Sequence, residues 1–423
     1  MLQVKKNRLK LSAKEFKYLK YLSRGAKHLY NVSLYNVRQQ HFQKKPFLGY
    51  VKNYNKTKSH RDYERLPSDV AQYVMKQVDH NYRSFFALAK LKAAGKYDEP
   101  ISPPKYIEKD GYFTLGFPIR KTNSKEYFGV ILPKRFKERF GLKNIHIPIP
   151  EEIKDKTLKE VRIVPKCNAK YFEIEWVYEV ETEPIVVNEE RAIGIDPGVS
   201  NFAVIVDSIS GLPIILDGKK IKSINRFYNK ENTGKQPGSR SQLVMFQKRH
   251  RILDDALNQY VNFIIQYCIE NKVSKVVVGQ GHLAQNGSNL GAVTNQNFVN
   301  IPFGRFNQKL EGKCEFYGIE YVKQEESYTS KCDHLAGEEM VHHEKYMGKR
   351  RHRGLFKSST GTLLNADVNG ALGILLKSKH EVDLNRLVSR GCLTQPRRVT
   401  LDEIQKNSSI RLVKWLCQSS LGS

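Results

Sequence analysis

The sequence predicts a chain built from three kinds of structure: a helical part, an all-β part and an α/β part. Apolar and aromatic residues recur at helical spacing over 12–45 and 67–95, which predicts two helices. Short alternating stretches over 112–188 predict antiparallel strands that close a small barrel or sandwich. Strand and helix patterns alternate over 190–325, which is typical of an α/β sheet with some antiparallel strands. A chain of 423 residues is long enough for two to four packed units.

Local signals place the elements of the first 190 residues. Residues 1–8 are expected to form a short strand. Ser68 precedes apolar residues at helical spacing and is the expected N-cap of the second helix. Residues 52–65 are basic and polar, so we expect a loop there. The strands of the all-β part are expected within 112–117, 161–164 and 171–178.

A hairpin opens the α/β part. An apolar run leads to Asp196, Pro197-Gly198 turn the chain, and a second apolar run follows. This pattern predicts a β-hairpin that holds one aspartate at its tip.

The elements that follow alternate in type. A basic segment at 230–240, expected to be flexible, precedes a long helix over 241–271. The apolar run 275–278 predicts a buried parallel strand. A helix over 301–318 and a strand over 320–323 come next, whereas 332–361 looks irregular and the tail after Lys377 has no clear pattern.

The charge of the chain indicates a polyanionic partner. Lys and Arg number 71 and Asp and Glu number 43, so the formal net charge is +28. Neutralising phosphates with Lys and Arg releases condensed counterions, which favours nucleic acid. No run of 18 apolar residues and no signal peptide is present, so we expect no membrane role. The six cysteines lack paired spacing and are expected to be reduced thiols in a cytoplasmic protein.

Two carboxylates on rigid elements indicate a type of chemistry. Asp196 lies at the hairpin tip, and Asp367 opens an amphipathic helix over 365–377. A single Asp-Pro-Gly turn is common on protein surfaces, so the pair carries the argument. Carboxylates that hold two metal ions are the machinery of phosphodiester hydrolysis. The pair therefore suggests a two-metal nuclease.

Together these motifs resemble the RuvC (RNase H-like) nuclease core of the TnpB family, transposon-encoded relatives of type V CRISPR effectors. Residues 362–375 are similar to the third RuvC motif of that family, and 295–303 and 325–331 also match it. The resemblance is dense from about 190 to 400 and loose before that. It implies a β-barrel wedge domain (1–10 and 101–189), an inserted helical recognition lobe (11–100), a RuvC nuclease (190–330 and 362–377), a degenerate zinc-ribbon-like insert that binds target nucleic acid (331–361), and a C-terminal tail (378–423).

One catalytic position departs from the family pattern. The family usually has a glutamate at the end of the central strand, where this chain has Gly279. Either the nuclease is inactive, or another acid fills the gap. Glu325 and Glu326 follow the next predicted strand, and a glycine at 279 leaves room for such a side chain. The resemblance thus implies two Mg²⁺ ions held by Asp196, Asp367 and either Glu325 or Glu326, since strand alternation does not decide between the two.

The insert lacks the cysteine pairs of the family's zinc ribbon. Only Cys332 lies in this stretch, with His334, His342 and His343 nearby. Adjacent histidines rarely converge on one tetrahedral ion. We therefore expect no zinc, a remnant held by local packing, and a basic flap at 342–353 over nucleic acid.

The resemblance implies an RNA-guided DNA endonuclease that cleaves next to a short flanking motif, with a guide RNA and double-stranded target DNA as partners. Basic residues mixed with aromatic ones at 14–20, 76–83 and 248–251 are candidate contacts to nucleic-acid backbones. Two alternatives stay open: a nuclease-inactive RNA-guided repressor, and a RuvC-type nuclease that uses no RNA. The oligomeric state is open as well.

Overall fold

The computed structural model describes residues 1–97, 100–119, 126–210, 212–280, 301–352, 354–389, 393–407 and 409–419, the last five of these without side chains. The chain divides into two compact units, Met1–Glu181 and Thr182–Ser423, here called the N-terminal and the C-terminal unit. Of the helices in the described ranges, none is both long enough and apolar enough to cross a membrane.

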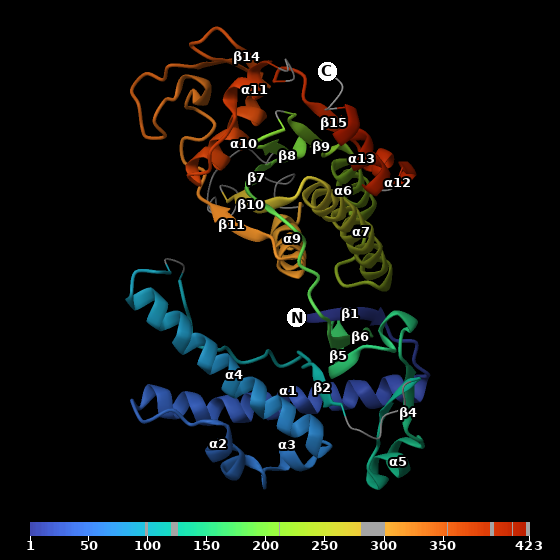
Figure 1. The fold of residues 1–423 in the computed structure, drawn as a ribbon. Coiled ribbons are helices and arrows are strands. Elements are labelled where there is room, and N and C mark those ends of the chain that lie inside the picture. Colours follow the sequence, from blue (N-terminus) through green and yellow to red (C-terminus); the bar gives the residue numbers. More distant parts are fainter. Residues whose placement is uncertain are drawn as a thin grey trace. The chain divides into compact units, whose positions relative to one another are not determined.

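Two long helices, α1 (Ala13–Phe42) and α4 (Ser68–Ala93), pack side by side in the N-terminal unit (Figure 1). A capping box begins α1: the Glu15 amide donates to Ser12 Oγ, and the Ser12 amide donates to the Glu15 carboxylate at 2.7 Å. The expected Ser68 cap of α4 is wrong. Pro67 occupies the N-cap position without a side-chain hydrogen bond, and Ser68 is already helical.

The loop expected over 52–65 is also wrong, because α2 (Tyr50–Thr57) and α3 (Arg61–Glu64) occupy this stretch. The buried residues of α2 are polar. Asn53 Nδ2 donates to the carbonyl oxygen of Ser33 in α1 at 3.1 Å and to its hydroxyl at 2.9 Å. A helix that buries hydrogen-bonded polar groups shows no apolar periodicity, so the sequence pattern missed it.

The all-β part forms two antiparallel sheets. The larger has the order β1-β6-β5-β2, and β3 pairs with β4. The first strand of the chain lies beside β6, so the two ends of the N-terminal unit meet in one sheet. Within the described ranges no strand pairing joins the sheets into a barrel, and a closed barrel stays a prediction. The elements are β1 (Leu2–Arg8), β2 (Leu115–Pro118), β3 (Tyr127–Val130), α5 (Lys134–Phe140), β4 (Ile145–Pro148), β5 (Thr157–Lys166) and β6 (Tyr171–Glu179).

A six-stranded mixed sheet with the order β11-β10-β7-β8-β9-β15 forms the centre of the C-terminal unit. Strands β7, β8 and β9 are antiparallel, β10 and β11 run parallel to β7, and β15 runs parallel to β9. This arrangement confirms the predicted hairpin and the predicted α/β sheet. The strands are β7 (Asn188–Pro197), β8 (Asn201–Asp207), β9 (Ile214–Asp217), β10 (Val273–Gly279), β11 (Glu320–Gln324) and β15 (Arg397–Val399).

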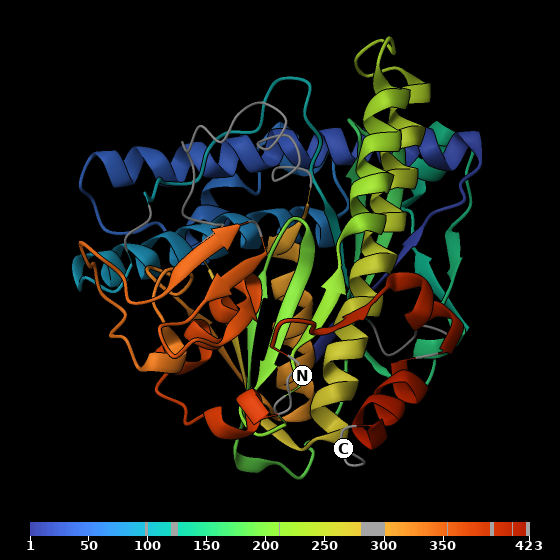
Figure 2. The same cartoon turned by 90° about the horizontal axis from the view of Figure 1, so that it is seen from above.

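Helices cover both faces of this sheet. Ile195 and Val278 pack in the core that includes α7 (Arg240–Glu270) and α9 (Phe303–Tyr317); α7 is the long helix beside the strands in Figure 2. Val277 packs on the opposite face with residues of α10 (Ala366–Lys377). Because side chains alternate along a strand, Asp196 and Gly279 belong to this second face, called the α10 face below.

Several short elements lie where no pattern was visible. The helix α6 (Lys219–Asn232) reaches into the segment expected to be flexible. The expected irregular stretch contains β12 (Lys349–His352) and β13 (Leu355–Lys357), which form a small sheet with β14 (Leu363–Asn365). The tail forms α11 (Leu384–Ser389), β15, α12 (Leu401–Asn407) and α13 (Ser409–Ser419). Strands of three or four residues are too short to show periodicity.

Candidate active site

Strand register brings Asp196 and Gly279 together. Asp196 is the last residue but one of β7, and Gly279 is the last residue of β10. The strands pair in parallel with Ile195 opposite Val278, so the next residues along each strand are neighbours on the α10 face. Gly279, where the resemblance predicts a glutamate, therefore lies beside Asp196.

The side chain of Glu326 fills the space that Gly279 leaves open. A Cβ atom built on Gly279 would lie 2.1 Å from Glu326 Oε1 and 2.6 Å from Ile374 Cδ1. Glu326 follows β11, which ends at Gln324, so its carboxylate arrives from the adjacent strand. A residue with a side chain at 279 would have to displace it.

Asp196 is in electrostatic contact with two further carboxylates. The residue as a whole is partly exposed, but protein atoms are dense around its carboxyl group. Burial, and then the negative charges of Glu326 and Asp367, raise the pKa of Asp196 well above its usual range. A Cβ atom on Gly370 of α10 would lie 2.8 Å from Asp196 Oδ2, so a residue without a side chain permits this approach. Like charges gathered in this way cost free energy unless a cation neutralises them.

Hydrogen bonds fix both the backbone and the side chain of Asp367. It lies in the first turn of α10, where the helix dipole favours a carboxylate. The N-cap residue Asn365 accepts hydrogen bonds from the amides of Asp367 and Val368 at 3.0 and 3.4 Å. From β8, Asn201 Nδ2 donates to Asp367 Oδ2 at 2.7 Å.

Glu325 lies apart from this cluster. Its side chain is 63% exposed and accepts a hydrogen bond from Lys377 Nζ at 2.6 Å and one from the Ser327 amide at 2.5 Å. Partial desolvation raises the pKa of Glu325, but the hydrogen bonds from Lys377 and Ser327 outweigh it and leave the pKa lowered. Of the two candidate acids, Glu326 and not Glu325 is brought to Asp196.

The donor set fits Mg²⁺. Carboxylate oxygens are the hard ligands that Mg²⁺ prefers, and a cation would relieve the repulsion that raises the pKa of Asp196. In the described ranges, no group of three or more His, Cys, Asp or Glu side chains converges tightly enough to hold a metal ion by itself. Mg²⁺ keeps several waters and needs only one or two carboxylates, so a looser set suffices.

The four candidate zinc ligands each contact other parts of the chain. Cys332 Sγ donates to the Glu339 carbonyl oxygen at 3.4 Å, and the same oxygen lies 2.8 Å from His343 Nε2. His334 Nε2 lies 2.6 Å from the Thr329 carbonyl oxygen, and the His342 ring is in T-shaped contact with the Tyr328 ring.

Two carboxylates accept hydrogen bonds that join separate segments of the insert (331–361). Asp333 is fully buried, and its Oδ2 accepts from Ser358 Oγ at 2.9 Å and from the amide and hydroxyl of Ser359 at 2.6 and 2.9 Å. Glu338 accepts from the amides of Asp333 and Met347 at 2.7 and 2.8 Å. Neither acid had a sequence signal, because nothing in their spacing distinguishes them from solvated surface charges.

The basic stretches divide into surface cations and core aromatics. Lys14 and Lys17 are exposed, whereas Tyr18, which directly follows Lys17, is fully buried in the core. In the same way Arg83 is exposed and the adjacent Tyr82 is fully buried. These aromatic rings serve packing rather than base stacking. The first part of the matched motif 295–303, up to residue 300, lies outside the described residues.

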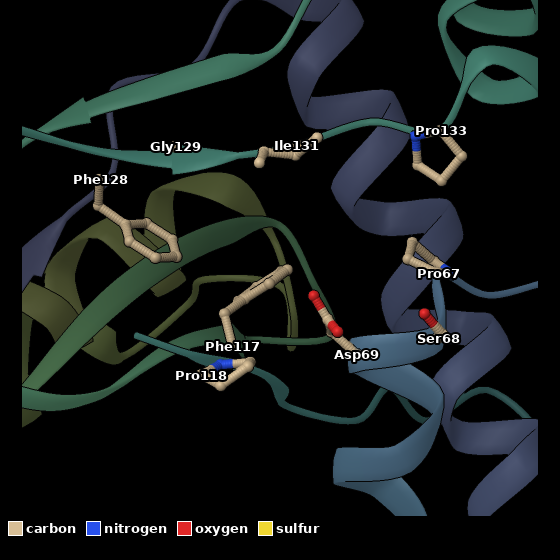
Figure 3. A pocket seen from close by; sticks show the side chains of 9 residues that line it. All are labelled: Pro67, Ser68, Asp69, Phe117, Pro118, Phe128, Gly129, Ile131 and Pro133. Atoms are coloured by element: carbon tan, nitrogen blue, oxygen red, sulfur yellow. The ribbon is translucent and has the colours of Figure 1, made fainter. Parts of the chain in front are cut away.

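A small pocket of about 180 Å³ lies in the N-terminal unit, at the start of α4 (Figure 3). Phe117, Phe128 and Ile131 form its apolar side, and Ser68 and Asp69 its polar side. None of its nine lining residues is basic, so nothing in the lining favours phosphate binding.

Two segments match known families. Residues 303–374 match the family described as "Cas12f1-like, TNB domain", and residues 175–283 match the family described as "Probable transposase". The TnpB-like protein ORF457 of Acidianus two-tailed virus is 26% identical over 400 residues, which cover 83% of this chain and 81% of that protein.

A solved structure shares the fold. The Cas12f1 chain in the "Cryo-EM structure of the Cas12f1-sgRNA-target DNA complex" matches with a TM-score of 0.54 and 16% identity, over 86% of this chain and 83% of that one. The mixed α/β architecture therefore fits a fold of the TnpB and Cas12 kind. Together, the two family matches, the viral relative and the shared fold support a TnpB family protein, which confirms the resemblance found in the sequence.

Proposed function

We propose that this chain is an RNA-guided DNA endonuclease that hydrolyses target DNA with Mg²⁺. The observation that carries the proposal is the environment of Asp196. Burial, and then the negative charges of Glu326 and Asp367, raise the pKa of Asp196 well above its usual range. Folding brings these acids together from β7, the chain after β11, and α10, against their mutual repulsion. Such an arrangement is explained most simply by a cation site.

The roles of the side chains follow from their surroundings. Asp196, Glu326 and Asp367 would hold two Mg²⁺ ions, which when bound supply an activated water and stabilise the leaving oxygen. Gly279 allows Glu326 to approach Asp196. Asn201 holds one oxygen of Asp367 by hydrogen bonding. Cleavage would leave a 3′-hydroxyl and a 5′-phosphate.

The proposed partners are a guide RNA and double-stranded target DNA. The solved relative is, by its title, a complex of Cas12f1 with an sgRNA and target DNA. A net charge of +28 suits the backbones of two nucleic acids. Exposed cations such as those of β12 (Lys349–His352) would bind phosphates without reading sequence. Base pairing would then select the target, and the protein would read only a short flanking motif.

One preparation tests the proposal. The chain is expressed with its native flanking DNA, and the purified protein is examined for bound RNA and for cleavage of a matching target in Mg²⁺ and in EDTA. We expect a structured RNA that dissociates steeply with salt, and cleavage that depends on Mg²⁺. The variants Asp196→Ala and Asp367→Ala should keep the RNA and lose cleavage.

The outcomes separate the alternatives. RNA-bound wild-type protein that binds its target and never cleaves it would identify a nuclease-inactive repressor. Cleavage by protein that carries no RNA would identify an RNA-independent nuclease. Wild-type-like cleavage by the Asp196 or Asp367 variant would overturn the assignment of the site.

A further inference from the structure

The strand β15, in the C-terminal tail, reaches the candidate active site. It pairs in parallel with β9, with Arg398 opposite Ile215. Val399 is fully buried in the sheet core, whereas the neighbouring Arg398 side chain is 42% exposed. Arg398 lies outside both segments that match known families.

Arg398 makes two hydrogen bonds through one nitrogen. Its Nη1 donates to Asp217 Oδ2 at 2.8 Å and to Asn201 Oδ1 at 3.0 Å. Asp217 is buried at the end of β9, and its other oxygen accepts from the Lys219 amide at 2.6 Å. The guanidinium is thus anchored on a fixed carboxylate and presents a donor to Asn201.

This contact sets the orientation of an amide beside Asp367. Arg398 can only donate hydrogen bonds, so Asn201 must turn its oxygen toward Arg398. The Asn201 Nδ2 group then faces Asp367 Oδ2, to which it donates at 2.7 Å. With the amide reversed, its oxygen would face the carboxylate oxygen and repel it.

We propose that Arg398 is a positioning residue that orients Asp367 for metal binding through the Asn201 amide. The inference rests on the proposed nuclease function, in which Asp367 holds Mg²⁺. Residues that hydrogen-bond a metal ligand commonly change metal affinity or activity by roughly 10–100-fold when removed. The C-terminal tail would therefore be part of the active site.

The neighbouring Arg397 offers a matched control. Its guanidinium donates to Glu403 at 2.9 Å, and its side chain is 35% exposed. Arg397→Ala therefore removes a similar ion pair from the same strand without touching Asn201. Equal losses of thermal stability in Arg397→Ala and Arg398→Ala would show that the fold responds alike to both changes.

The experiment uses the full chain with its copurified RNA. Single-turnover cleavage, KM for target DNA and the Mg²⁺ midpoint are measured for wild type, Arg398→Ala, Arg398→Lys, Arg397→Ala and Asn201→Ala. We expect Arg398→Ala to lower the rate and raise the Mg²⁺ midpoint, each by about 10-fold. KM should not change, Arg398→Lys should recover most of the loss because it keeps a donor, and Arg397→Ala should match wild type.

A double variant tests whether Arg398 acts through Asn201. Arg398→Ala combined with Asn201→Ala should be no worse than Asn201→Ala alone, because both act on one contact. Three outcomes would each overturn the inference: additive losses in the double variant, a rise in KM without a loss of rate in Arg398→Ala, or wild-type behaviour of Arg398→Ala. None of them affects the proposed nuclease function as long as the wild type cleaves.

A second readout does not need activity. Mn²⁺ binding to the purified protein is measured by electron paramagnetic resonance for the same variants. If the wild type never cleaves, the proposed function fails, and the inference is then decided by this measurement alone. Weaker Mn²⁺ binding in Arg398→Ala and unchanged binding in Arg397→Ala would support it, and equal binding in both would overturn it.

Discussion

The carboxylate of Glu326 lies where a side chain of Gly279 would begin, because a Cβ atom on Gly279 would be 2.1 Å from Glu326 Oε1. The two positions are separated by 47 residues in the sequence, which is the difference between their numbers, yet they share one volume beside Asp196. The position of the Glu326 carboxylate therefore depends on the absence of a side chain at residue 279.

Gly279→Ala should abolish cleavage although it adds only one methyl group. That methyl group would displace the Glu326 carboxylate, and we expect a loss of at least ~10²-fold, as when a charge stabiliser of the transition state is removed. The matched control is Gly129→Ala in β3, where a Cβ atom would meet only His146 Cδ2 at 3.8 Å. Single-turnover cleavage of a matching target measures the effect. Normal cleavage by Gly279→Ala would show that the position of Glu326 is unimportant.

Glu326→Gln and Glu325→Gln should behave differently. Glutamine keeps the size of glutamate and loses its charge, so Glu326→Gln should slow cleavage by at least ~10²-fold, equivalent to roughly 3 kcal/mol. Glu325→Gln only weakens an exposed pair with Lys377 and should cleave within a few-fold of wild type. Rate measurements at saturating Mg²⁺ compare the two variants. The reverse order would assign the metal ligand to Glu325.

Asp196→Asn should stabilise the metal-free protein while it abolishes cleavage. The pKa of Asp196 is raised in the folded state, so ionising this group opposes folding at every pH above its unfolded-state pKa. The neutral asparagine removes that cost, and we expect Tm in EDTA to rise by roughly 2 °C or more, which corresponds to about 1 kcal/mol. Below the unfolded-state pKa the difference should vanish, because both forms are then neutral.

Mg²⁺ should reverse this gain. A bound cation neutralises Asp196 in the wild type and has less to bind in the variant, so Tm of the wild type should rise more with Mg²⁺. Asp254→Asn serves as control, because Asp254 is a partly exposed acid that pairs with Arg305 on the surface. A lower Tm for Asp196→Asn in EDTA would contradict the repulsion inferred here.

Asp333, rather than a metal, should stabilise the insert. Asp333→Ala removes the acceptor for the hydroxyl of the buried Ser358 and for two groups of the exposed Ser359, and losing these three hydrogen bonds to a buried carboxylate should cost about 2 kcal/mol or more. Tm and the protease sensitivity of 331–361 report this loss. Glu344→Ala, which changes an exposed acid of the same segment, should have no effect.

A chelator provides the complementary test of the insert. Treatment with a strong zinc chelator should leave Tm unchanged, and metal analysis should find less than stoichiometric zinc. Stoichiometric zinc, with unfolding of the insert on chelation, would show that Cys332 and the nearby histidines hold an ion after all.

The sequence by itself determined the outline of the C-terminal unit. Alternation and apolar runs located β7, β8 and β10, and the positions of Asp196 and Asp367 relative to a strand end and a helix start followed from local patterns. Through the resemblance, it also raised the expectation that Glu325 or Glu326 takes the place of a glutamate at 279. Periodicity is a local property, so it reveals which face of an element a residue occupies.

Only the tertiary structure decided which side chains meet. Glu325 and Glu326 lie beyond the end of β11, where strand alternation no longer sets direction, and the pairing of Glu325 with Lys377 separates them. Arg398 had no sequence signal, because β15 has three residues and its partner β9 lies about 180 positions earlier. Contacts between distant segments depend on how whole elements pack, and no local spacing in the sequence records that.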